Sequence, residues 1–218
     1  MKVLPNGDVL FENVKALYPR LDKCYRFDSI ENKTVPAQPT EDGAAYEISF
    51  EMEKSVCAEL HKHALKIYTE SAAADTKRKW KTEPMYMPYK SNEEGNYVGK
   101  AKLKGAYSGD VTRPPLQKDA ERKDVPEGFQ LTTGSTVNVW GKLFAYNTGA
   151  VSGVALRLKG VQVIELAERD AVDDPFSATS GFSASNAPAA DTSDPFGLPP
   201  VPTSTPSIDD SLDDAIPF

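Results

Sequence analysis

Cations and aromatic rings with a polar edge are concentrated in one part of this chain, residues 76–123. This segment holds twelve Lys or Arg residues against six Asp or Glu, although the whole protein has a net charge of -7. It contains no Phe, and its aromatic residues are Trp80, Tyr86, Tyr89, Tyr97 and Tyr107. A ring with a polar edge can stay exposed and still offer a flat face for stacking. Because phosphates bind cations and unpaired bases stack on exposed rings, the pattern is typical of sequence-tolerant binding to single-stranded nucleic acid.

The alternation of residue types predicts a strand within residues 95–107. Successive side chains of a strand point to opposite faces, so Lys100, Lys102 and Lys104 should share one face. Like charges on one face repel one another, and a bound polyanion would relieve that repulsion. The simpler interpretation is a solvated edge strand whose lysines discourage aggregation. We expect this face to bind a polyanion.

A second alternating segment covers residues 137–146. One face carries Val137, Val139, Leu143 and Ala145, and the other carries Trp140, Lys142, Phe144 and Tyr146. Aromatic side chains usually lie inside, which would suit Phe144. Lys142 stands among the rings, however, and favours exposure of that face. We therefore expect the aromatic face to be a stacking surface.

The predicted contacts with DNA combine the cationic and aromatic side chains of these segments. They are Lys77, Arg78, Lys79, Trp80, Lys81, Tyr86, Tyr89, Lys100, Lys102, Lys104, Tyr107, Arg113, Trp140 and Lys142. Two other interpretations stay open. Cations alone would also serve a duplex-binding architectural or transcription-linked protein. The chain could instead be an interaction scaffold that binds no DNA.

The elements that must position these side chains are mostly strands. Strands are expected over residues 9–17, 24–30, 46–53, 95–107, 134–146 and 152–166. The first should end at Tyr18-Pro19, and Asn147-Thr148-Gly149 should turn the last two into a hairpin. Residues 31–43 and 108–127 are rich in Pro and charge and should be loops, the second long enough to be functional. Several strands with one helix predict a mainly β domain, either a small barrel or a sandwich.

One helix is expected from Ser55, as its cap, to about Ala73. Its apolar stripe should be Val56, Leu60, Ala64 and Ile67. Cys57, His61 and His63 lie on the same helix, but a structural zinc site needs four ligands and Cys24 would have to come from a distant strand. We expect no metal and no cofactor.

The end of the chain differs sharply from the rest. Residues 170–218 hold nine Asp and no Lys or Arg, so residues 1–169 keep a net charge of +2. The acidic part is also rich in Pro, Ser, Thr and Ala, a composition typical of disorder. We expect a folded domain over residues 1–167 and a disordered tail over 168–218. A basic-rimmed apolar pocket on a partner could take the last residues, Asp213, Asp214, Ile216, Pro217 and Phe218.

Two shorter peptides in the tail, Asp174-Pro175-Phe176 and Asp194-Pro195-Phe196, repeat part of this ending. Either they act as additional docking peptides on the same tether, or they recur by chance in a biased composition.

The tail resembles that of bacterial and phage single-stranded DNA-binding proteins, although Ala215 stands where those tails usually carry another Asp. The order of elements is similar to that of phage-encoded members with an oligonucleotide-binding (OB) fold. The matching parts are Phe11–Pro19, Tyr46–Glu53 before the helix, Lys77–Lys81, and the hairpin from Phe144 to Gln162. The resemblance implies a five-stranded barrel with additions that binds single strands through Trp80, its neighbouring bases and the face around Lys102. It also implies a role in phage DNA replication, recombination or repair, with partners recruited by the tail.

Other classes of protein find little support. The start of the chain lacks an apolar run, and no stretch approaches the roughly 20 apolar residues of a membrane helix. Two Cys are too few for a disulfide framework, which fits a reducing cytoplasm, that of the host if the protein is phage-encoded. No phosphate-binding loop or hydrolase motif occurs. We expect a soluble, non-enzymatic protein.

Overall fold

The computed structural model describes residues 1–92 and 96–168. The expected tail beyond Glu168, with its docking peptides, lies outside the described residues.

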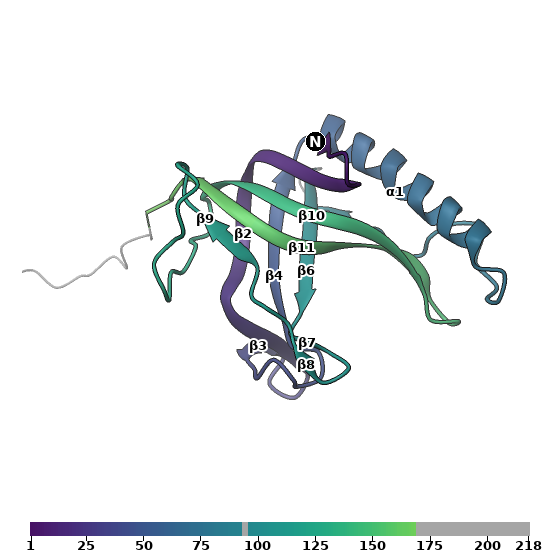
Figure 1. Cartoon of the computed structure of the whole chain (residues 1–218), viewed down its shortest axis with the longest axis horizontal. Coiled ribbons are helices and arrows are strands. Elements are labelled where there is room, and N and C mark those ends of the chain that lie inside the picture. The colour runs from purple at the N-terminus through teal and green to yellow at the C-terminus, as the bar shows by residue number, and fades with distance from the viewer. Residues whose placement is uncertain (93–95, 169–218) are drawn as a thin grey trace, which may run out of the picture. The chain divides into compact units, whose positions relative to one another are not determined.

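Five long strands close into a barrel (Figure 1). They are β2 (Asp8–Asp28), β4 (Ala45–Met52), β6 (Tyr97–Lys104), β10 (Thr136–Asn147) and β11 (Ser152–Glu165). Their order is β6-β4-β2-β10-β11, and β11 returns to β6 in a short parallel contact. All other neighbouring pairs in the barrel are antiparallel. This confirms the predicted mainly β fold with one helix and a five-stranded barrel with additions, and it excludes the sandwich.

Short strands extend the barrel at several edges, and two more form a separate two-stranded sheet. β1 (Lys2–Val3) and β3 (Lys33–Pro36) pair with β2, β5 (Tyr89–Ser91) pairs with β6, β9 (Leu116–Lys118) runs parallel to β11, and β7 (Ala106–Tyr107) pairs with β8 (Asp110–Val111). The segments 31–43 and 108–127 are therefore not simply loops, because each contributes short strands. Pro36 is the last residue of β3, and the other Pro residues of these segments lie outside the short strands.

The first two expected strands are in fact one, so the predicted end at Tyr18-Pro19 is wrong. Leu17 pairs with Ser49 and Arg20 pairs with Glu47, which leaves two residues of β2 opposite one of β4. Pro19 lies in this bulge, where its missing N–H costs no ladder hydrogen bond. Tyr18 takes a positive φ of 47° there, so the strand bends instead of ending.

The helix α1 (Lys54–Ala74) packs against β10, β11 and β6. Glu53 precedes its first turn and no side chain caps it, so the predicted Ser55 cap is wrong. Ser55 lies inside the first turn, where its hydroxyl is near the Glu53 carboxylate at 3.4 Å. The buried residues of α1 are Cys57, Leu60, Ala64 and Tyr68; the predicted Val56 and Ile67 are only partly buried. Among the described residues, no helix has the length and apolar character needed to cross a membrane.

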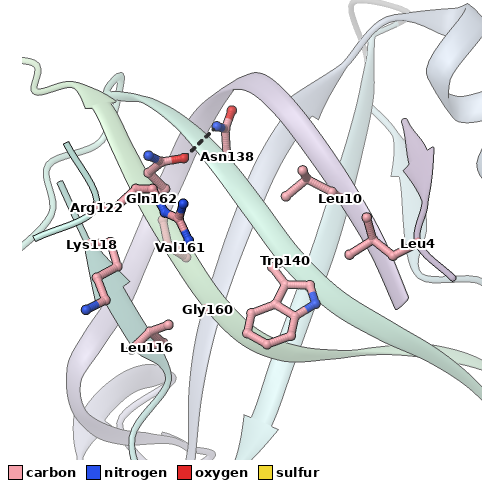
Figure 2. Close-up of a pocket in the computed structure, with 10 residues that line it drawn as sticks. All are labelled: Leu4, Leu10, Leu116, Lys118, Arg122, Asn138, Trp140, Gly160, Val161 and Gln162. Atoms are coloured by element: carbon pink, nitrogen blue, oxygen red, sulfur yellow. Dashed lines mark hydrogen bonds between the residues drawn. The ribbon is translucent and has the colours of Figure 1, made fainter. Parts of the chain in front are cut away.

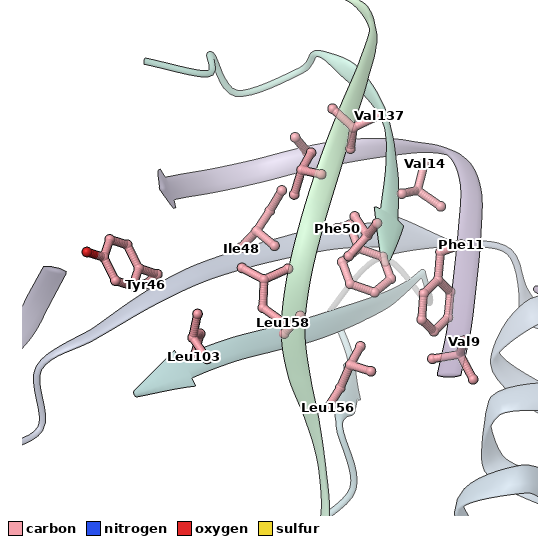
Figure 3. Packing of buried hydrophobic residues seen from close by; sticks show 14 of the residues in the cluster. Val9, Phe11, Val14, Tyr46, Ile48, Phe50, Leu103, Val137, Leu156 and Leu158 are labelled. Atoms are coloured by element: carbon pink, nitrogen blue, oxygen red, sulfur yellow. The ribbon is translucent and has the colours of Figure 1, made fainter. Parts of the chain in front are cut away.

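Large apolar side chains from every barrel strand fill the interior (Figure 3). The rings of Phe11 and Phe50 meet with centroids 4.8 Å apart. A Cβ at position 99 would lie 2.7 Å from the Phe50 ring, so only Gly99 leaves room for that ring. Ala101 and Leu103 also point inward on β6, which sends the lysines between them to the outside.

Candidate nucleic-acid interface

Three cations stand side by side across the outer face of the barrel. Lys102 of β6 is the register partner of Arg157 of β11, and Arg157 is in turn the partner of Lys142 of β10. All three side chains are exposed. We call them the cation row. The cation row runs across β6, β11 and β10 and not along any one of these strands.

One end of the cation row opens into a groove of about 370 Å³, lined by Lys102, Lys104, Tyr107, Phe144 and Arg157 among others. The Arg157 guanidinium carbon lies 5.1 Å from the ring centroid of Tyr107 and 5.1 Å from that of Phe144. A cation between two rings gives this groove, the Arg157 groove, both partners that a nucleotide needs: charge for the phosphate and flat faces for the base.

The outer face of β10 continues this surface. Val137, Val139 and Leu143 are buried, whereas Trp140, Phe144 and Tyr146 are partly exposed on the opposite face. The predicted orientation of this strand is therefore confirmed. Phe144 and Tyr146 are neighbours, with ring centroids 6.4 Å apart.

A buried carboxylate fixes the ring of Trp140. Trp140 Nε1 donates a hydrogen bond of 2.9 Å to Asp8 Oδ2, and Lys159 Nζ donates one of 2.7 Å to the same oxygen. Lys159 also lies 5.1 Å from the centroid of the Trp140 ring. Burial alone would raise the pKa of Asp8, but the hydrogen bonds from Lys159, Trp140 and Asn6 together hold that pKa below its ordinary value. The carboxylate is therefore ionised at neutral pH and holds the indole by its polar edge.

A second carboxylate, Glu47, stands beside the cation row on β4. It forms ion pairs with Arg20 and with Lys100, whose Nζ lies 2.9 Å from Glu47 Oε2. It is also the register partner of Lys102. Burial raises the pKa of Glu47, but hydrogen bonds and charge from Lys100, Lys102 and Arg20 together lower it by more, so the net pKa is below the ordinary value. Of the three predicted lysines of β6, Lys100 is thus already paired, whereas Lys102 and Lys104 line the Arg157 groove.

The predicted segment Lys77–Lys81 lies at the turn between β10 and β11. Arg78 donates a hydrogen bond of 2.7 Å to the Asn147 carbonyl. The Trp80 ring packs edge-on against Tyr68 of α1 at 5.2 Å, and its Nε1 donates to Asp75 at 3.2 Å. Lys77, Lys79 and Lys81 belong to the same stretch, and none of the five lines the Arg157 groove.

The remaining predicted contacts are dispersed. Tyr86 bridges to Gly153 at the start of β11 and is 54% exposed. Tyr89 faces α1, where its hydroxyl lies 2.7 Å from His61 Nδ1. Arg113 is exposed between β8 and β9 and lines a different hollow. The structure therefore gathers Lys102, Lys104, Tyr107 and Lys142 with Trp140 on one face. Lys100 shares the outward face of β6 but is paired with Glu47, and the other predicted contacts lie apart from this face.

Comparison with known proteins gives a clear result only for structure. No family model and no curated protein sequence matches this chain. The single-stranded DNA-binding protein from bacteriophage Enc34 in complex with ssDNA superposes with a TM-score of 0.57 at 17% identity, covering 76% of this chain and 90% of that one. The single-stranded DNA-binding protein gp2.5 encoded by bacteriophage T7 gives 0.53 at 19% identity, covering 79% and 98%.

This chain has the fold of these phage single-stranded DNA-binding proteins. At 17% and 19% sequence identity, the similarity shows a shared fold and nothing more. It confirms the OB-type barrel that the sequence resemblance implied, and it extends over most of the folded part of the chain.

Two residues of this face are absent from the sequence prediction, Arg157 and Lys159 of β11, whereas Phe144 belongs to the predicted aromatic face although it is not among the predicted contacts. A signal for Arg157 and Lys159 existed, because they alternate with Leu156 and Leu158 inside a predicted strand. Within the described residues, no three His, Cys, Asp or Glu side chains come together as a metal site, and Cys24 and Cys57 are buried free thiols.

Proposed function

We propose that the folded part of this chain binds single-stranded DNA without reading its sequence, along the outer face of β6, β11 and β10. The observation that carries this proposal is the cation row Lys102–Arg157–Lys142, which leads into the Arg157 groove. Phosphates would lie along the row, and a base would stack on the partly exposed ring of Tyr107 or Phe144, beside the Arg157 guanidinium that contacts both rings. The neighbouring structure of the Enc34 protein, which was determined with ssDNA, supports the same class of ligand.

The geometry favours a single strand over a duplex. A ring can stack only on a base whose face is free, and the bases of a duplex already stack on one another. The Arg157 groove offers two such rings beside one guanidinium. A protein that needed only the duplex backbone would have no use for them. Rings stack on every base, so the binding should tolerate any sequence.

We assign the central contacts to Lys102, Lys104, Tyr107, Lys142 and Trp140, joined by Arg157. The other predicted contacts, namely Lys77, Arg78, Lys79, Trp80, Lys81, Tyr86, Tyr89, Lys100 and Arg113, remain predictions. A DNA strand that left the central face at the β10–β11 turn would pass close to residues 77–81, because Arg78 is hydrogen-bonded to that turn.

A fluorescence titration with poly-dT at several salt concentrations tests this function. If about four to six phosphates are neutralised, log affinity should fall with log salt at a slope of about -3 to -4. An equal-length duplex should compete poorly. Equal competition by the duplex would favour the architectural alternative. An absence of binding to either DNA in dilute buffer would end the proposal and favour the interaction scaffold.

We further propose that residues 168–218 are a tail that recruits replication, recombination or repair proteins through Asp213, Asp214, Ile216, Pro217 and Phe218. As a tethered polyanion, the tail would also compete with DNA for the cation row. Deleting residues 170–218 should then tighten DNA binding and abolish partner recruitment. Unchanged or weaker DNA binding would remove the competition. In this proposal the protein is not an enzyme and acts in the cytoplasm of the phage host.

A further inference from the structure

A second pocket, distinct from the Arg157 groove, lies farther along β10. It has a volume of about 400 Å³ and lies between Trp140 and Leu10 on one side and Leu116 and Arg122 on the other. Figure 2 shows the Trp140 ring facing this space from β10, with β9 across from it. We call it the Trp140 pocket. Its size is within the range of sites that hold small ligands.

Gly160 forms the floor of the Trp140 pocket. A Cβ at this position would lie 2.9 Å from the Leu116 carbonyl oxygen and 3.4 Å from Cε3 of Trp140. Only glycine therefore lets β9 pair with β11 while the Trp140 ring from the neighbouring strand β10 lies close to the same position. Asp8 holds the polar edge of the same ring, and Lys159 lies over the ring with its Nζ 5.1 Å from the centroid. The ring is thus fixed from below and at its edge, and its remaining surface lines the pocket.

The amides in the wall of the pocket are already engaged. Asn138 Nδ2 donates to Gln162 Oε1 at 3.0 Å, and Asn138 Oδ1 accepts from the Asn13 backbone N–H at 2.9 Å. Gln162 Nε2 donates to the carbonyls of Asp119 and Ala120, each at 3.2 Å. Because these amide groups are already hydrogen-bonded within the protein, they cannot distinguish the hydrogen-bonding edges of different bases. A ligand would therefore be held by its flat face and by its charge.

The charge in this pocket comes from two cations of unequal availability. Lys118 Nζ is paired with Asp124 at 2.7 Å. Arg122 is exposed, and in the part of the chain that the structure describes its guanidinium makes no ion pair. A free guanidinium opposite an indole ring is suited to a phosphate whose base stacks on that ring.

We propose that the Trp140 pocket is a second nucleotide-binding site, which takes one unpaired base of any type on Trp140 and its phosphate on Arg122. The proposal rests on the proposed function and extends it. Phe144 and Trp140 lie on the same face of β10 four residues apart, which is roughly 13 Å along a strand. Lys142 stands between them. A single strand can therefore run from the Arg157 groove along β10 and end in the Trp140 pocket.

The test compares Arg122→Gln, Arg122→Lys and the control Lys62→Gln in the full chain. Lys62 is an exposed cation of α1, away from both sites, so its loss removes the same charge from the protein as a whole. The probe is oligo-dT long enough to cover the face, titrated by fluorescence anisotropy at several salt concentrations. We expect Arg122→Gln to weaken binding by about threefold to fivefold and to reduce the salt slope by about 0.7, the value for one phosphate. Arg122→Lys should restore the slope, and Lys62→Gln should match the wild type.

An Arg122→Gln variant with the affinity and salt slope of Lys62→Gln would overturn the proposal. Circular dichroism of each variant shows whether it is folded, and Arg122→Lys keeps the test valid if the Gln variant is not. Arg157→Gln separates this failure from that of the proposed function. If Arg157→Gln weakens binding and Arg122→Gln does not, only the second site is wrong. If no protein in the series binds oligo-dT, the proposed function itself fails.

Discussion

Lys102 of β6 and Arg157 of β11 are partners in the short parallel contact that closes the barrel. Each would repel the other, and Arg157 has Lys142 on its other side. The same strand pairing that completes the fold thus brings three positive charges together. Nothing in barrel closure requires cations at these outward positions, so the repulsion makes sense if a polyanion neutralises it.

The first prediction concerns Arg157→Gln. This change removes a phosphate partner and the cation between Tyr107 and Phe144, so affinity for oligo-dT should fall about tenfold or more. Thermal stability should stay the same or rise slightly, because repulsion from Lys102 and Lys142 is relieved. Anisotropy titration and thermal melting measure the two effects. Wild-type affinity in a folded Arg157→Gln protein would remove this residue from the interface.

A second prediction follows from Glu47, which competes for the cations beside the row. Glu47→Gln frees Arg20 and Lys100 and removes a negative charge opposite Lys102. We expect affinity for oligo-dT to rise roughly threefold to tenfold, with a steeper salt slope, because more cations can bind phosphate. Titrations at several salt concentrations check both quantities.

Glu51→Gln is the matched control for that change. Glu51 points outward from the same strand but has Val98 as its register partner instead of a lysine. Its loss should alter affinity little. If Glu51→Gln raises affinity as much as Glu47→Gln does, the effect comes from the net charge of the protein and not from the position of Glu47 beside the cation row.

The sequence predicted which residues face outward far better than which strands become neighbours. Alternation alone oriented β6 and β10, because one face of each strand must be buried. It could not predict that β11 would meet β6, since this pairing depends on closure of the whole barrel. Arg157 was missed for that reason: its importance comes from Lys102 and Phe144, which are distant in sequence.

The two tryptophans show the same limit in another form. Trp80 stands among four cations in the sequence and Trp140 lies two residues from Lys142, and each has an indole that could stack on a base. Packing separates them: Trp80 lies against Tyr68 of the helix, whereas Trp140 lines an open pocket. No local pattern distinguishes these outcomes, because Tyr68 reaches Trp80 only after α1 has packed.

This difference gives a third prediction, on intrinsic fluorescence. The chain has only two Trp residues, so each single Phe variant reports on the other. Trp80→Phe should keep most of the quenching by oligo-dT, because Trp140 lines the binding face. Trp140→Phe should lose most of it. Strong quenching in Trp140→Phe would instead place Trp80 against the bases and restore the segment 77–81 as a central contact.

The last prediction concerns Asp8 and pH. Its folded-state pKa is lowered from the ordinary value of 3.8, so its charged form stabilises the protein above that pH. The contribution is fully present above about pH 4 and is lost as pH falls through the lower, folded-state pKa. Asp8→Asn weakens the hydrogen bonds with Trp140 and Lys159 and should cost about 1–3 kcal/mol of unfolding free energy at neutral pH.

Urea unfolding of wild type and Asp8→Asn between pH 3 and pH 8 measures this difference. It should be constant from about pH 5 upward and shrink below about pH 4, because the wild-type carboxyl then becomes neutral as well. Asp110→Asn, an exposed carboxylate of β8, should show no such difference. A gap between wild type and Asp8→Asn that widens as the solution is acidified would mean that burial outweighs the hydrogen bonds. The folded-state pKa of Asp8 would then be above the ordinary value, and its charge would not be what holds Trp140.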